Sequence, residues 1–117
     1  MGQHTWFYKE KDKYLKMNEL YEKVDKAKNY EDGYDELDAQ AFYYQAEELR
    51  EENESDYHDC FRTSKKNEDG TYIEDVIFSK KECDEWLENN KETVYCLNRE
   101  SLDKFWEEYP NGIIEFG

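Results

Sequence analysis

The chain has 117 residues, of which 37% are hydrophobic and 40% are charged, and its formal net charge at pH 7 is −15. This length predicts a single domain over residues 1–117 with a modest core, in which three Trp, eleven Tyr and six Phe residues partly make up for a shortage of aliphatic side chains. The negative charge argues against direct binding to DNA, RNA or an anionic membrane surface and favours basic partners.

The N-terminal half predicts one strand followed by two helices. The aromatic and β-branched run at residues 5–8 is typical of a strand. From Lys9 to about Asn29, apolar residues recur three and four apart, which predicts an amphipathic helix whose inner face is Tyr14, Met17, Leu20, Tyr21, Val24 and Ala27. After a turn at Asp32-Gly33, a second helix is predicted over residues 35–52 with Asp35 as its cap. Its apolar positions are Leu37, Ala41, Tyr44 and Leu49, flanked by Phe42 and Tyr43.

The C-terminal half predicts strands alternating with helices. Residues 57–64 and 71–78 have strand character and are joined by a tight turn at Asp69-Gly70. Residues 76–87 and 95–106 form an internal repeat of a short strand, a cap and a helix, and Ser79 with Glu82 is typical of a capping box. A last strand is predicted over residues 113–116. We therefore expect an α+β fold in the order β-α-α-β-β-α-β-α-β, with about four helices over one small mixed or antiparallel sheet of about five strands.

The charge is unevenly distributed along the chain. Residues 9–28 carry a net charge of +2, residues 29–60 carry −11 and residues 61–117 carry −6. The middle segment also contains six aromatic residues, so it combines the charge of a disordered tail with the side chains of a packing or binding surface. The end of the predicted second helix places four Glu residues at the negative end of the helix dipole, a local conflict of the kind found more often at functional sites.

This acidic, tyrosine-rich segment has two interpretations. It is either a solvated helix face whose Tyr residues pack inward, or a row of carboxylates that imitates a phosphate backbone and binds the basic channel of a nucleic-acid-handling protein. Such binding is fast and sensitive to salt. The predicted binding residues are Glu47, Glu48, Glu51, Glu52, Glu54 and Asp56, with Tyr43 and Tyr57 as anchors.

Other kinds of chemistry have weaker signals. His58 and Cys60 are two residues apart and form the best candidate for a metal-binding or hydrolytic site. His4 or Cys96 could complete such a site only if folding brings them close to this pair. The paired ligand spacing that is typical of structural zinc sites is absent. Neither Gly33 nor Gly70 fits a calcium loop, and no glycine-rich phosphate loop is present. We expect no enzymatic activity, no metal and no cofactor, with a metal-binding or hydrolytic domain as the alternative.

The cysteines and the termini favour a cytoplasmic protein. Cys60, Cys83 and Cys96 form an odd set without closely spaced pairs, and the chain begins without a signal peptide and lacks an apolar run long enough to cross a bilayer. We therefore expect reduced thiols and no membrane association.

The opening residues MGQHTWFYK, the small size and the acidic, Tyr-rich composition resemble small proteins encoded by bacteriophages. Among such proteins, anti-CRISPR and anti-restriction proteins are often acidic nucleic-acid mimics that block a host defence nuclease. The resemblance implies an inhibitor that acts in the host cytoplasm through protein–protein interaction, and it assigns a role to no residue. A structural phage protein is a further alternative.

Overall fold

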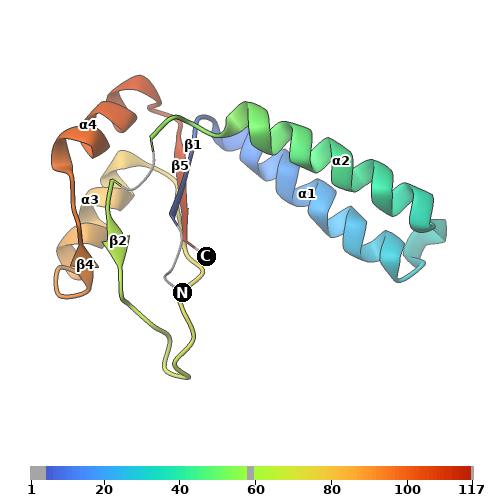
Figure 1. Cartoon of the computed structure of the whole chain (residues 1–117), viewed down its shortest axis with the longest axis horizontal. Coiled ribbons are helices and arrows are strands. Elements are labelled where there is room, and N and C mark those ends of the chain that lie inside the picture. Colours follow the sequence, from blue (N-terminus) through green and yellow to red (C-terminus); the bar gives the residue numbers. More distant parts are fainter. Residues whose placement is uncertain (1–4, 58–59, 117) are drawn as a thin grey trace. The chain divides into compact units, whose positions relative to one another are not determined.

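The computed structural model describes residues 5–57 and 60–116, and the chain divides into two compact units (Figure 1). Lys11–Glu54 forms a helical hairpin unit, and Met1–Glu10 with Ser55–Gly117 forms a sheet unit. The elements are β1 (Thr5–Tyr8), α1 (Lys11–Lys28), η1 (Glu31–Gly33), α2 (Glu36–Asn53), β2 (Arg62–Thr63), β3 (Val76–Ile77), α3 (Lys80–Asn89), β4 (Val94–Tyr95), α4 (Arg99–Glu108) and β5 (Ile113–Phe116). This order confirms the α+β class and the predicted succession of strands and helices. The extent of the domain stays a prediction.

In the helical hairpin unit, α1 and α2 run side by side in opposite directions (Figure 1). The predicted inner face of α1 is confirmed, because every predicted position is buried except Tyr21, which is half-buried. The chain reverses through η1, where Gly33 has a φ of 78°, a left-handed conformation that glycine adopts without steric cost. The turn predicted at Asp32-Gly33 is therefore present.

The strands form two antiparallel sheets where the sequence predicts one. In the first sheet β5 lies between β1 and β3, so that Ile114 pairs with Phe7 on one side and with Ile77 on the other. In the second, β2 pairs with β4, and Arg62 lies opposite Tyr95.

The predicted hairpin of residues 57–64 and 71–78 is wrong in its length. Its turn is present, with a bridge between Lys66 and Tyr72 and a φ of 85° at Gly70, but β2 and β3 are two residues each and pair with different strands. Residues 66–72 are exposed, so no packed face stabilises a longer ladder there. The two repeat strands likewise enter different sheets, β3 the first and β4 the second.

The core of the sheet unit is aromatic. The ring of Phe105 makes an edge contact with that of Phe7 at 5.2 Å between centroids, and Trp86 stacks on Phe116 at 4.9 Å. The buried cluster joins the first sheet to α3 and α4 and comprises Phe7, Cys60, Phe61, Ile73, Ile77, Cys83, Leu87, Leu102, Phe105, Trp106, Ile114 and Phe116. Edge and offset geometries are the favoured arrangements of aromatic rings, and such pairs add to the stability gained by burial.

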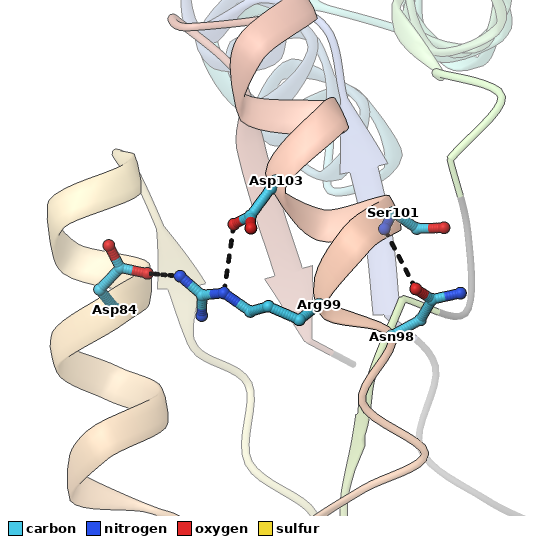
Figure 2. A network of polar contacts seen from close by, with 5 residues as sticks. All are labelled: Asp84, Asn98, Arg99, Ser101 and Asp103. Atoms are coloured by element: carbon cyan, nitrogen blue, oxygen red, sulfur yellow. Dashed lines mark hydrogen bonds and ion pairs between the residues drawn. The ribbon is translucent and has the colours of Figure 1, made fainter.

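The two repeat helices begin at side-chain caps and are joined by one arginine (Figure 2). Asn98 accepts a hydrogen bond from the Ser101 N–H at 3.1 Å, and Ser79 accepts one from the Glu82 N–H at the same distance. The predicted capping box at Ser79 is incomplete, because the Glu82 carboxylate accepts from the Phe78 N–H instead. The guanidinium of Arg99 on α4 bridges to Asp84 on α3 at 2.6 Å and to Asp103 at 3.1 Å.

Candidate functional site

Helix α2 carries five of the eight predicted binding residues, Glu54 is its C-terminal cap, and its start is defined by its sequence. Asp35 accepts a hydrogen bond from the Asp38 N–H at 3.0 Å, and the Asp38 carboxylate accepts one from the Asp35 N–H at 3.0 Å. This reciprocal capping box satisfies two backbone donors that the first turn of a helix leaves unpaired. The predicted role of Asp35 as the cap is confirmed.

The buried face of α2 differs from the predicted one. Its buried residues are Ala39, Ala46 and Asn53, seven residues apart, whereas Leu37 and Tyr44 are 73% and 69% exposed. The spacing of seven residues keeps one side of a helix against a partner helix. The prediction failed because α1 already fills the interface with the bulk of Met17, Leu20, Val24 and Tyr14, so α2 turns its small residues inward.

As a result, α2 presents a continuous exposed face with an apolar half and an acidic half. Residues spaced three, four and seven apart share one side of a helix. On α2 the exposed residues with this spacing, here called the outer face, are Leu37, Gln40, Ala41, Tyr44, Glu48 and Glu51. The exposed Glu52 lies beside them in sequence and adds a third carboxylate.

The predicted acidic residues of α2 have different surroundings. Glu48, Glu51 and Glu52 are exposed, and no hydrogen bond or ion pair engages them within the described part of the chain. Glu47 is half-buried and accepts a hydrogen bond from the Tyr21 hydroxyl at 2.5 Å. Glu54 lies at the C-terminal cap of α2 and pairs with Arg50 at 3.4 Å. Three of these carboxylates are therefore available to a partner, and two are held within the hairpin.

The contact between α1 and α2 also affects a tyrosine hydroxyl. Burial and the hydrogen bond to Glu47 raise the pKa of Tyr21, an effect that Arg50 partly offsets. Because the ring of Tyr43 contacts that of Tyr21 at 6.5 Å and is 46% exposed, Tyr43 is both part of the hairpin packing and accessible. Its role as a binding anchor stays a prediction.

Asp56 and Tyr57 belong to the sheet unit. The ring of Tyr57 makes edge contacts with Phe105 at 5.8 Å and Tyr109 at 6.3 Å, and its hydroxyl donates a hydrogen bond to Glu108 at 2.7 Å. This hydrogen bond is the main reason why the pKa of Tyr57 is raised to about 12. Tyr57 therefore packs on the core of its own unit, and its joint action with the acidic residues of α2 stays a prediction.

A shallow groove lies between the two helices near the closed end of the hairpin. It has a volume of about 290 Å³ and is lined by Val24, Lys28, Ala39, Gln40, Tyr43 and Tyr44. Val24 and Ala39 are buried, while the remaining lining residues are exposed. The sequence does contain a signal for this arrangement. Ala39 and Ala46 are seven residues apart and mark the face of α2 that packs on α1, which leaves Tyr44 outside the helix interface and at the edge of this groove.

The metal-binding alternative lies partly outside the described residues, because these do not include His58 or His4. Cys60 is buried in the core of the sheet unit. Within residues 5–57 and 60–116, no group of three or more His, Cys, Asp or Glu side chains is arranged to hold a metal ion. Cys83 is also buried, and burial raises the pKa of its thiol to about 11, so it is protonated at neutral pH and is a poor nucleophile or ligand.

Comparison of the chain with protein-family models, with curated proteins and with solved structures found no match. Among the described residues, no helix combines the length and the apolar character that crossing a membrane requires. The candidate site is therefore defined by the geometry of α2 and its packing against α1.

Proposed function

We propose that this chain is a protein-binding inhibitor that occupies the basic, nucleic-acid-binding surface of another protein. The observation that carries the proposal is the set of exposed carboxylates of Glu48, Glu51 and Glu52, which have no partner among the described residues and follow an exposed tyrosine on the same helix. A binding surface needs charge for attraction and rigid aromatic side chains for short-range contact, and α2 offers both.

The electrostatics of the whole chain support the same kind of partner. A net charge of −15 repels nucleic acids and attracts proteins that are built to hold them. Lys and Arg side chains that contact phosphates can contact carboxylates with similar geometry. The resemblance of the opening residues to small phage proteins narrows the proposed target to a host defence nuclease, as in anti-CRISPR and anti-restriction proteins.

The test is a pull-down from bacterial lysate with the tagged chain at low and high salt, followed by identification of the captured proteins. We expect a nucleic-acid-binding protein that salt releases and that DNA or RNA displaces, because the same basic surface binds both. A partner that remains bound at high salt and ignores nucleic acid would contradict the proposal.

A matched pair of triple variants isolates the role of α2. Glu48→Lys, Glu51→Lys and Glu52→Lys together should weaken binding to the identified partner by about tenfold or more, because attraction becomes repulsion at the contact. The control reverses three exposed acidic residues of the sheet unit, Glu85, Glu92 and Glu107, which changes the net charge by the same amount. Equal losses in the two variants would show that net charge alone drives binding and that α2 is not the contact.

A further inference from the structure

A second groove lies between α1 and α2, further from the closed end of the hairpin than the first. It has a volume of about 280 Å³ and is lined by Lys16, Leu20, Gln45, Glu48, Leu49 and Glu52. We propose that this groove, here called the Glu48 groove, receives an arginine side chain of the partner protein. This inference rests on the proposed function and names the contact that its acidic residues make.

The most buried residues that line the Glu48 groove are apolar. Leu20 of α1 is buried, and Leu49 of α2 is half-buried. An arginine side chain packs its methylene stem on apolar surface while its charged head stays at the edge in water. The guanidinium is planar and more weakly hydrated than a lysine ammonium, so it loses less hydration energy when it lies against leucine side chains.

The α2 side of the groove carries the negative charge. Gln45, Glu48 and Glu52 are spaced three and four residues apart, so they share one side of the helix. The two glutamates are about 6 Å apart along the helix axis, and a guanidinium between their carboxylates can donate hydrogen bonds to both. Both side chains are exposed, and within the described residues neither takes part in a hydrogen bond or ion pair.

The α1 side of the groove contributes one cation, Lys16, against the two carboxylates. Lys16 is exposed, and among the residues that the structure describes no ion pair joins it to Glu48 or Glu52. The carboxylates therefore remain available, but the charge of Lys16 opposes the entry of a second cation. This arrangement predicts a specific signature, because removal of the Lys16 charge should strengthen the binding of an arginine.

The lining distinguishes arginine from other occupants. A calcium ion needs six to eight oxygen ligands, whereas two carboxylates line the groove and the described part of the chain contains no group of side chains arranged to hold a metal ion. In a second copy of the chain, two of the three arginines are already engaged, Arg50 with Glu54 and Arg99 with Asp84. A protein that holds nucleic acid presents arginines on its surface, because their planar fork of donors suits phosphates.

The experiment uses hexa-arginine and hexa-lysine, two peptides of equal charge, as probes of the full-length chain. Backbone amide shifts in NMR titrations at physiological salt measure the affinity and locate the binding site. We expect hexa-arginine to bind at least about threefold more tightly, with its largest shifts at Leu20, Glu48 and Leu49. Equal affinities, shifts concentrated outside the groove or the absence of binding would each overturn the inference.

A matched pair of double variants assigns the preference to the groove. Glu48→Gln with Glu52→Gln should abolish the preference for hexa-arginine, because both acceptors of the guanidinium lose their charge. The control, Glu22→Gln with Glu51→Gln, removes the same charge at two exposed positions of the hairpin that do not line the groove, and it should keep the preference. Circular dichroism verifies that both variants keep their helices. A preference that survives in the first variant, or is lost in both, would contradict the inference.

A single variant tests the effect of the lysine in the groove. Lys16→Gln should tighten the binding of hexa-arginine by about twofold or more, because it removes a like charge at short range. Lys23→Gln removes an exposed cation of α1 that does not line the groove, and it should have a smaller effect. Equal changes in the two variants would show that net charge alone acts and would overturn the inference.

The outcomes separate this inference from the proposed function. If the pull-down recovers a nucleic-acid-binding protein but the two peptides bind equally, the groove inference fails and the proposed function stands. If hexa-arginine is preferred but the captured partner ignores salt and nucleic acid, the proposed function fails and the groove stands as an arginine-binding site. A dimer in sedimentation that Glu48→Gln with Glu52→Gln dissociates would identify a second copy as the occupant and contradict the inference.

Discussion

The helical hairpin unit and the sheet unit use their aromatic residues in opposite ways. In the sheet unit six of thirteen aromatic residues are buried, and they pack against one another across the core. In the hairpin only one of seven is buried, Tyr14. Two helices share one interface and each buries a narrow stripe, whereas a sheet covered by helices has a whole face to fill. The comparison indicates that aromatic residues fill the core of one unit, whereas in the other most of them are half-buried or exposed.

The largest expected effect on stability comes from removing an aromatic ring from the core of the sheet unit. Phe105 is fully buried and contacts Phe7, Tyr57, Trp106 and Tyr109, so Phe105→Ala should destabilise the sheet unit by about 3–5 kcal/mol. All three tryptophans of the chain lie in this unit, so their fluorescence during urea unfolding measures the loss. The control is Phe78→Ala at an exposed ring, which should cost far less. Similar costs for the two would show that the core is not where the stability lies.

The second test concerns the narrow interface of the hairpin. Ala46 is fully buried at the α2 interface, so Ala46→Leu should overfill it and cost about 1–3 kcal/mol. Ala41→Leu places the same side chain on the outer face of the same helix and should change stability by less than about 0.5 kcal/mol. Helical circular dichroism during thermal unfolding compares the two. If Ala41→Leu is the more damaging variant, the assignment of the buried face is wrong.

The third test compares a helix cap in each unit. Asp35→Ala removes one half of the capping box of α2, and Ser79→Ala removes the side-chain cap of α3. Each should cost about 1 kcal/mol, since a backbone N–H loses its acceptor. Urea midpoints followed by circular dichroism for the first variant and by tryptophan fluorescence for the second measure the effects. Unchanged midpoints would mean that water replaces the caps without loss.

The smallest expected effect is a dependence on alkaline pH in the sheet unit. The pKa of Tyr57 is raised from 10 to about 12, mainly by its hydrogen bond to Glu108, so the folded state holds the hydroxyl proton more tightly than the unfolded state does. The resulting stabilisation is complete below pH 10 and is lost as the pH rises through about 12. Tyr57→Phe should remove this component from the pH dependence of the urea midpoint, and Tyr95→Phe serves as the control. A Tyr57→Phe curve parallel to that of the wild type would contradict the role of the hydrogen bond.

Much of the fold could be predicted because local signals define it. The run at residues 5–8, the spacing of apolar residues in α1 and the caps at Asp35, Ser79 and Asn98 act over a few residues each. They were sufficient for the order and type of the elements. The strand partners were not predictable, because β2, β3 and β4 are two residues long and pair only where the packed core brings backbones together.

For the candidate site, the sequence by itself determined the composition, and the tertiary structure decided the arrangement. The density of carboxylates and tyrosines in residues 29–60 and the helix that carries most of them follow from local sequence. The side of α2 that faces outward depends on α1, since two helices in contact cannot both place large residues at one interface. Packing against α1 exposed Leu37 and Tyr44, and packing in the other unit placed the ring of Tyr57 against Phe105. Such choices arise between segments distant in sequence, where no local pattern records them.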